Sequence, residues 1–162
     1  MRLVLALCAL ASAAALSSVV SYDRTLAMDV PAGWGLCPPK AFSGEKKPPA
    51  FCLEKAHADG PPGLLVMPLE LNQAYDARLP LHQVAELDLS MRRGKVKGGE
   101  FTELKLVKFR KDMEGWGFAM KSQEAGFDLF YFEAGAKRYY ATCLSVYEKD
   151  CFSSLRTIHP RH

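Results

Sequence analysis

Four cysteines are the side chains of this sequence best suited to chemistry: Cys37, Cys52, Cys143 and Cys151. Three pairings are open, and their spacing along the chain favours Cys37–Cys52 and Cys143–Cys151. Asp150 is expected to cap a final helix, which places Cys151 in the first turn, where a helix dipole activates a thiol as a nucleophile. The sequence therefore offers two roles for the second pair, a thiol–disulfide centre or a structural disulfide, and export favours the structural one.

Other catalytic patterns are incomplete. Residues 43–46 read Ser-Gly-Glu-Lys, which fits the S-x-x-K pattern of penicillin-recognising enzymes, but they lie among prolines and lack the S-D-N and K-T-G partner motifs. The sequence holds no G-x-S-x-G, H-E-x-x-H or C-x-x-C, and no two of its histidines stand at the spacing typical of zinc ligands. We therefore expect no catalytic residue, no cofactor and no metal.

Basic and aromatic residues point instead to a surface for a partner. A basic run is expected at the end of the first helix: Arg92, Arg93, Lys95 and Lys97. Such a run suits either solvated cations at a helix C-terminus or an anionic partner. Trp34 and Trp116 each lie between two glycines, which either leaves the indole exposed for stacking or lets it fill the end of a sheet. The net charge of only +3 argues against nucleic acid as the main partner.

Hydrophobic periodicity predicts the elements that carry these residues. Alternating or continuous apolar residues predict seven strands, at 24–30, 51–58, 64–71, 101–109, 116–120, 127–132 and 140–146. Apolar residues at three- and four-residue steps predict a helix over 80–93, whose stripe is Leu81, Val84, Leu87 and Met91. A short helix is expected at the C-terminus. The pattern predicts an α+β domain on an antiparallel sheet of about seven strands, with one inserted and one C-terminal helix.

Three positions refine this sheet. Pro68 has no N–H to donate, so the strand over 64–71 is expected at an edge. Residues 127–132 are apolar on both faces, which indicates a central strand. The alternation slips near Leu106, where a bulge would bring the flanking apolar residues to one side.

The first 15 residues have the pattern of a secretory signal peptide. Arg2 precedes an apolar run, and Ala13 and Ala15 occupy the −3 and −1 positions of an A-x-A cleavage site. Apolar character continues to Val20, so a retained N-terminal membrane anchor is the alternative. Cleavage leaves residues 16–162 as a single domain with a Cys-bracketed loop at 37–52, in an oxidising compartment where cysteines pair.

The order of elements and three short segments resemble the PsbP-like superfamily of small α/β/α sandwich proteins. The segments are Val-Pro-Ala-Gly-Trp at 30–34, similar to the end of the family's first strand, Met-Glu-Gly-Trp-Gly at 113–117, similar to a glycine turn entering the middle hairpin, and Phe-Ser-Ser-Leu-Arg at 152–156, similar to its closing helix. The loop at 37–52 departs from the family's pattern. Because most members are not enzymes, the resemblance implies a binding scaffold.

These observations predict an exported, non-enzymatic protein-binding module of a bacterial-type cell envelope, either an accessory factor or an inhibitor or immunity protein. Its contact with the membrane is expected to be peripheral at most. Two alternatives stay open: a thiol–disulfide enzyme using Cys151 and Cys143, and a carrier of a small apolar or anionic ligand. Free thiols would favour the enzyme, and an apolar cavity within the sandwich would favour the carrier.

Overall fold

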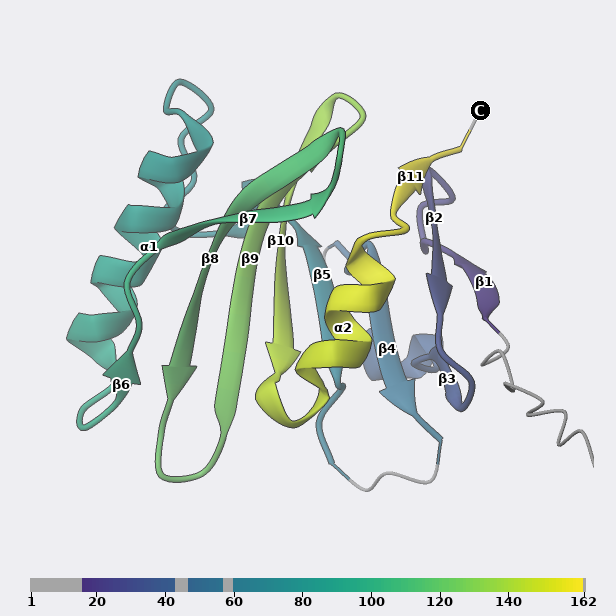
Figure 1. The fold of residues 1–162 in the computed structure, drawn as a ribbon, viewed down its shortest axis with the longest axis horizontal. Helices are drawn as coiled ribbons and strands as arrows, with labels where there is room; N and C mark the ends of the chain where they lie inside the picture. Colours follow the sequence, from purple (N-terminus) through teal and green to yellow (C-terminus); the bar gives the residue numbers. More distant parts are fainter. Residues whose placement is uncertain (1–15, 43–46, 57–59, 162) are drawn as a thin grey trace, which may run out of the picture.

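The computed structural model describes residues 16–42, 47–56 and 60–161, and its strands form two antiparallel sheets (Figure 1). The small sheet has the order β1-β2-β11, with β1 (Ser17–Val20), β2 (Leu26–Val30) and β11 (His159–Pro160). The large sheet has the order β3-β4-β5-β10-β9-β8-β6, and β7 also pairs with β8. Its strands are β3 (Trp34–Leu36), β4 (Phe51–Lys55), β5 (Leu64–Pro68), β6 (Glu100–Phe101), β7 (Lys105–Arg110), β8 (Met113–Lys121), β9 (Gly126–Ala134) and β10 (Lys137–Leu144).

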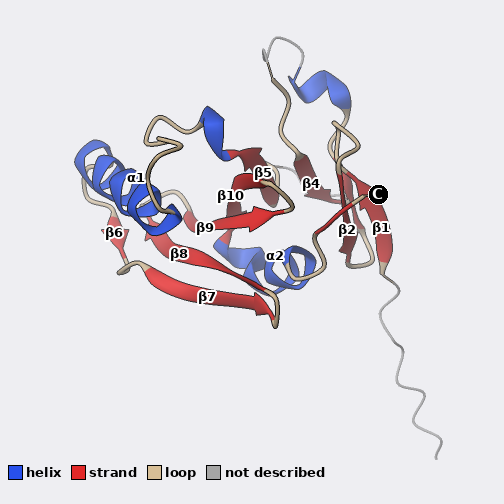
Figure 2. Cartoon of the chain, turned by 90° about the horizontal axis from the view of Figure 1, so that it is seen from above, coloured by secondary structure: helices blue, strands red, loops and turns tan. Residues whose placement is uncertain are grey.

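Two α-helices pack on opposite faces of the large sheet (Figures 1 and 2). They are α1 (Leu81–Lys95) and α2 (Glu148–Leu155); three short 3-10 helices, η1 (Pro39–Phe42), η2 (Leu69–Leu71) and η3 (Ser145–Tyr147), lie in the connections. No helix of the described residues is long and apolar enough to span a membrane. The predicted α+β class is confirmed. The predicted signal peptide and the S-x-x-K segment at 43–46 lie outside the described residues.

Strand β9 supplies side chains to both hydrophobic clusters. Leu129 and Tyr131 pack on the side of α1, while Phe130 and Phe132 pack on the side of α2. Successive residues of a strand point to opposite faces, so a strand covered on both sides is apolar throughout. The central position predicted from residues 127–132 is therefore confirmed, with β9 lying between β8 and β10.

The edge position predicted from Pro68 is wrong, because β5 lies between β4 and β10. The pairing of β4 with β5 extends only from Leu64 to Val66, so Pro68 lies beyond it and removes no hydrogen bond from that ladder. Pro68 also ends the strand, and the next three residues form η2. The fully buried residues of β5 are Leu64 and Val66.

Helix α1 begins after Pro80, as predicted, but its buried stripe differs from the predicted one. Val84, Ala85 and Leu89 are buried, whereas Leu87 is 46% exposed. The next position of the stripe is occupied by Asp88, which is only 5% exposed. A carboxylate at such a position needs polar partners, because a buried charge without them is strongly unfavourable.

Two further local predictions are corrected. The irregularity in the β7–β8 pairing lies between Lys108 and Arg110 instead of near Leu106. Phe109 thereby reaches the core, while Leu106 stays 48% exposed. Helix α2 begins one turn earlier than expected, with Tyr147 at its N-cap, so Asp150 lies inside the first turn and is not the cap.

Candidate functional site

A cleft of about 420 Å³ lies where the small sheet meets the large one, and we call it the inter-sheet cleft. Four stretches far apart in the sequence line it: the β1–β2 turn, the chain entering β4, the segment from β5 past η2, and the β9–β10 turn leading into β10. Pro48, Pro49, Pro68, Tyr75 and Ala136 give the cleft part of its apolar lining, and the lining as a whole is of mixed polarity. Five charged side chains line it as well: Asp23 and Lys137 form one ion pair, Lys47 and Glu70 form another, and Arg138 pairs with Glu133 outside the lining.

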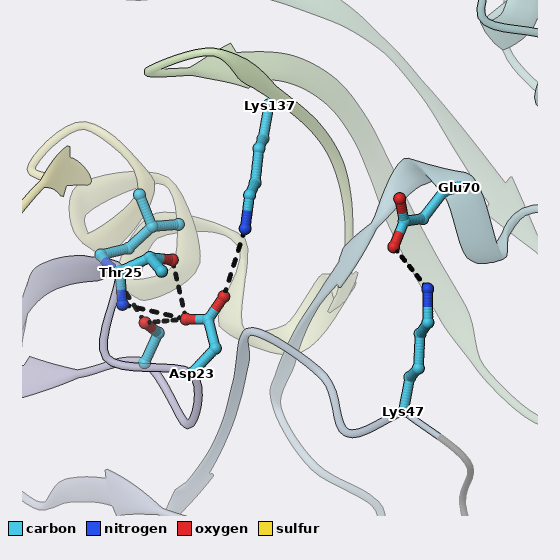
Figure 3. A network of polar contacts seen from close by, with 7 residues as sticks. Asp23, Thr25, Lys47, Glu70 and Lys137 are labelled. Atoms are coloured by element: carbon cyan, nitrogen blue, oxygen red, sulfur yellow. Dashed lines mark hydrogen bonds and ion pairs between the residues drawn. The ribbon is translucent and has the colours of Figure 1, made fainter.

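The first ion pair joins the two sheets. The Nζ atom of Lys137, at the start of β10, lies 3.7 Å from Oδ2 of Asp23 in the β1–β2 turn (Figure 3). The other carboxylate oxygen, Oδ1, accepts hydrogen bonds from Ser21 Oγ at 2.6 Å and from Thr25 N and Oγ1 at 3.0 and 2.8 Å. Arg24, with a φ of 60°, turns the chain at this point. The turn therefore fixes the Asp23 carboxylate before any partner arrives.

The second ion pair joins Lys47 Nζ to Glu70 Oε1 at 2.9 Å, apart from the first pair in Figure 3. Both side chains are more than half exposed. Exposed pairs of this kind contribute about 0–1 kcal/mol to stability, so their charges can exchange partners at little cost. The hydrogen bond from Lys47 and its charge lower the pKa of Glu70, which therefore stays ionised at neutral pH.

The geometry around Asp23 predicts a loss of stability in acid. Burial by itself raises the pKa of Asp23, but the hydrogen bonds from Ser21 and Thr25 outweigh it and hold the pKa below its ordinary value of 3.8. The stabilisation is therefore present above that value and is lost as the pH falls below it. The free energy of unfolding of the wild type should therefore fall between about pH 5 and pH 2. In Asp23→Asn this fall should be smaller, by about 1 kcal/mol or less.

Denaturant titrations at both pH values measure this difference, and Glu86→Gln on the exposed face of α1 is the matched control. An Asp23→Asn protein that loses as much stability in acid as the wild type would contradict the role given to Asp23.

Trp34 does not form an exposed stacking surface. Its side chain is buried, at 9% exposure, and it packs edge-on against Tyr147 with ring centroids 5.1 Å apart. Its Nε1 donates a hydrogen bond to Asp150 Oδ2 at 3.1 Å. A Cβ atom at Gly63 would overlap the indole, so this glycine makes the room that Trp34 occupies. Trp34 fills the end of the sheet, which is the second of the two readings drawn from the sequence.

Trp116 is half-buried on the α1 side of β8, beside His82 at a ring-centroid distance of 5.7 Å. The two glycines that flank Trp116 are required by the close packing of β8 on β9 and not by the indole. A Cβ atom at Gly115 would overlap the backbone carbonyl of Tyr131, and one at Gly117 would crowd Phe130. The Gly-Trp-Gly pattern thus reflects close packing of β8 on β9.

The basic run on α1 does not form one uniform patch. Arg92 pairs with the buried Asp88, Arg93 Nη2 donates to the carbonyl of Thr102 at 3.3 Å, and Lys95 Nζ donates to Gln73 Oε1 at 3.0 Å. Lys97 is exposed beyond the end of the helix. None of these four residues lines the inter-sheet cleft.

The cysteines form the two disulfides favoured by their spacing, Cys37–Cys52 and Cys143–Cys151. The second bond ties α2 to β10 and is buried, with Cys143 at 0% and Cys151 at 1% exposure. A thiol–disulfide centre needs access for an attacking thiolate, which this burial denies. The contacts of Cys143 and Cys151 therefore favour the structural role.

Asp88 is the charged residue that the sequence analysis missed. Its Oδ2 accepts hydrogen bonds from the Tyr131 hydroxyl and from Arg92 Nε, the latter at 2.7 Å. Burial, followed by the charge of Asp88, raises the pKa of Tyr131, so its hydroxyl stays protonated and donates. The sequence did carry a signal for this network, since Asp88 follows Val84 by four residues and precedes Arg92 by four on the same helix face.

The chemical character of the cleft follows from the residue types in its lining. Among the described residues, the lining of the inter-sheet cleft includes no serine, threonine, cysteine or histidine. Within residues 16–42, 47–56 and 60–161, no three His, Cys, Asp or Glu side chains gather to hold a metal ion. The cleft is thus equipped with apolar surface and paired charges, which are the features of a binding site.

The fold is a PsbP-like α+β sandwich. The structure is similar to the solution structure of the cyanobacterial PsbP protein CyanoP from Synechocystis, with a TM-score of 0.57 over 97% of this chain and 99% of that one. The two sequences are 10% identical, so the likeness establishes the fold alone. No family model and no curated protein matches the sequence.

Proposed function

We propose that this chain is an exported, non-enzymatic protein-binding module whose inter-sheet cleft takes a segment of a partner protein. The observation that carries the proposal is the lining of the cleft, which combines three prolines and other apolar side chains with two exposed ion pairs. Protein interfaces share this anatomy, with an apolar centre inside a polar rim.

The centre of the cleft is suited to a partner because it is already rigid. Pro48, Pro49 and Pro68 have fixed φ angles and no N–H groups that would need a partner. Tyr139, which also lines the cleft, is 1% exposed and held by the core. A preformed surface loses little conformational entropy on binding, which favours affinity.

The charged rim gives the cleft a means of choosing its partner. Lys137 and Lys47 offer positive charge, while Asp23 and Glu70 offer negative charge. A partner segment with both positive and negative side chains can form new ion pairs with these four residues that are less exposed than the present ones. A segment whose charges are placed differently would bring like charges together. We therefore expect a partner segment with an apolar centre and charges of both signs.

Export is supported by the two disulfides, since such bonds persist in oxidising compartments. The leader pattern of residues 1–15 agrees with this assignment.

A ligand carrier is the second candidate, because a hollow of about 630 Å³ lies beside Phe101 and Met120 at the end of β8. Its lining is more apolar than polar, as a site for a small apolar molecule requires. A carrier would bind its ligand in this hollow and would not require a protein partner at the inter-sheet cleft. Whether a partner protein contacts the cleft therefore distinguishes the two functions.

Photo-crosslinking in the native envelope tests the proposal. A photoreactive amino acid placed at Ala136 or Ala77, both exposed at the cleft, is expected to give one dominant protein adduct. The matched control is the same amino acid at Leu87, which is 46% exposed on the outer side of α1. A carrier would give no protein adduct at either cleft position.

A further inference from the structure

A second, smaller site lies between α1, β10 and the chain that follows η2. A pocket of about 280 Å³ is lined by Asn72, Gln73, Asp88, Arg92, Lys95 and Tyr140, together with two apolar side chains. Its volume suits a small molecule or a single side chain. It shares the η2 region with the inter-sheet cleft, since Glu70 lines the cleft and Gln73 lines the pocket. We call it the α1 pocket.

We propose that the α1 pocket binds a carboxylate group. Three of the lining side chains are cationic or hydroxyl donors, the Arg92 guanidinium, the Lys95 ammonium and the Tyr140 hydroxyl, and the amides of Asn72 and Gln73 add further N–H groups. Two of the three are cations, and Asp88 is the one acidic residue of the lining. The lining therefore carries an excess of one positive charge, which matches the single negative charge of a carboxylate.

Asp88 positions the Arg92 guanidinium and accepts from only one of its N–H donors. The carboxylate of Asp88 engages Arg92 only through Nε, at 2.7 Å, and is also bound by the Tyr131 hydroxyl. Arginine has five N–H donors in a rigid fork, so the remaining donors of Arg92 are held in a fixed direction. Its side chain is 30% exposed, which leaves it accessible from the pocket. Such a fork binds carboxylates with two parallel hydrogen bonds.

Lys95 and Tyr140 complete the donor set. Lys95 Nζ is held 3.0 Å from Gln73 Oε1, a neutral partner that positions the ammonium without cancelling its charge. Tyr140 stacks on Tyr131 with ring centroids 6.3 Å apart. Burial is the main cause that raises the pKa of Tyr140, so its hydroxyl stays protonated as a donor. It makes no side-chain hydrogen bond to any other residue of the described chain.

Titration of the full chain with acetate, followed by two-dimensional NMR at constant ionic strength, tests this site. Constant ionic strength matters because added salt screens the pocket's charges. We expect saturable shifts of the Gln73, Lys95 and Tyr140 amides, with a dissociation constant on the order of 1 mM. Removing one charged donor in Lys95→Gln should weaken binding about tenfold. Tyr140→Phe, which keeps the ring stack, should weaken binding by about threefold to tenfold.

The control is Lys97→Gln, which removes an exposed lysine two positions further along and should leave the affinity within about twofold. Arg92 is unsuitable as a test, because its removal leaves the buried Asp88 without its cation. An absence of saturation, an equal loss in Lys97→Gln, or tighter binding of phosphate than of acetate would overturn the proposal.

A second arm identifies the source of the carboxylate. A short peptide containing one glutamate is titrated in the same way. Binding more than about tenfold tighter than acetate would assign the pocket to an acidic side chain of a protein. Equal affinity would assign it to a small free acid, and both results support carboxylate binding.

Discussion

Replacing Asp88 by leucine is expected to lower the free energy of unfolding by about 3 kcal/mol, because the half-buried Arg92 loses its partner charge and the fully buried Tyr131 hydroxyl loses its acceptor. The substitution would strand the Arg92 guanidinium and remove the acceptor of the Tyr131 hydroxyl. The melting temperature of a domain of this size should fall by roughly 6–12 °C as a result. Thermal unfolding followed by circular dichroism measures the shift.

The double variant Asp88→Leu with Arg92→Met is the matched control. It removes both charges together, and replacing a buried pair by apolar residues of similar size is often nearly neutral. We expect it to recover about half of the stability lost in Asp88→Leu, because the buried Tyr131 hydroxyl still lacks its acceptor, at a cost of about 1–2 kcal/mol. A double variant as unstable as the single one would show that the cost does not come from an uncompensated charge.

Replacing Cys151 by serine is the second large effect. The Cys143–Cys151 bond closes a loop of sequence separation 8, and opening such a loop restores unfolded-state entropy worth about 2.5 kcal/mol. Helix α2 has only 8 residues, so it depends on this tether and on the burial of Leu155 to stay on the sheet. The melting temperature should fall by roughly 5–10 °C.

Ser153→Ala is the control for this prediction, since Ser153 lies on the exposed side of the same helix and should leave the melting temperature unchanged. An unchanged melting temperature in Cys151→Ser itself would show that the disulfide does not hold the last helix in place.

The elements predicted well from sequence are those whose signals are local. The doubly apolar run of β9 and the spacing of the apolar residues in α1 each lie within one continuous segment. The short strands β1, β3 and β11 were not predicted. β1 continues the apolar leader pattern, while β3 and β11 have three and two residues, too few to show alternation.

The candidate site could not be predicted from local signals, because it is assembled from distant segments. Asp23 meets Lys137 across 114 positions of the sequence, and Lys47 meets Glu70 across 23. No periodicity links such pairs, and each residue alone has the pattern of a solvated surface charge. For Trp34 the sequence left two readings open, because the environment of its indole depends on Gly63, which lies in the connection between β4 and β5.

Crosslinking from Ala136 tests the central claim most directly, because this residue lines the inter-sheet cleft next to Lys137. We expect one dominant protein adduct from Ala136, identified by mass spectrometry, and none of that protein from Leu87. We also expect that Lys137→Glu sharply reduces the adduct, since the rim then repels the acidic group of the partner. The same partner captured from Leu87 but not from Ala136 would place binding elsewhere and contradict the account.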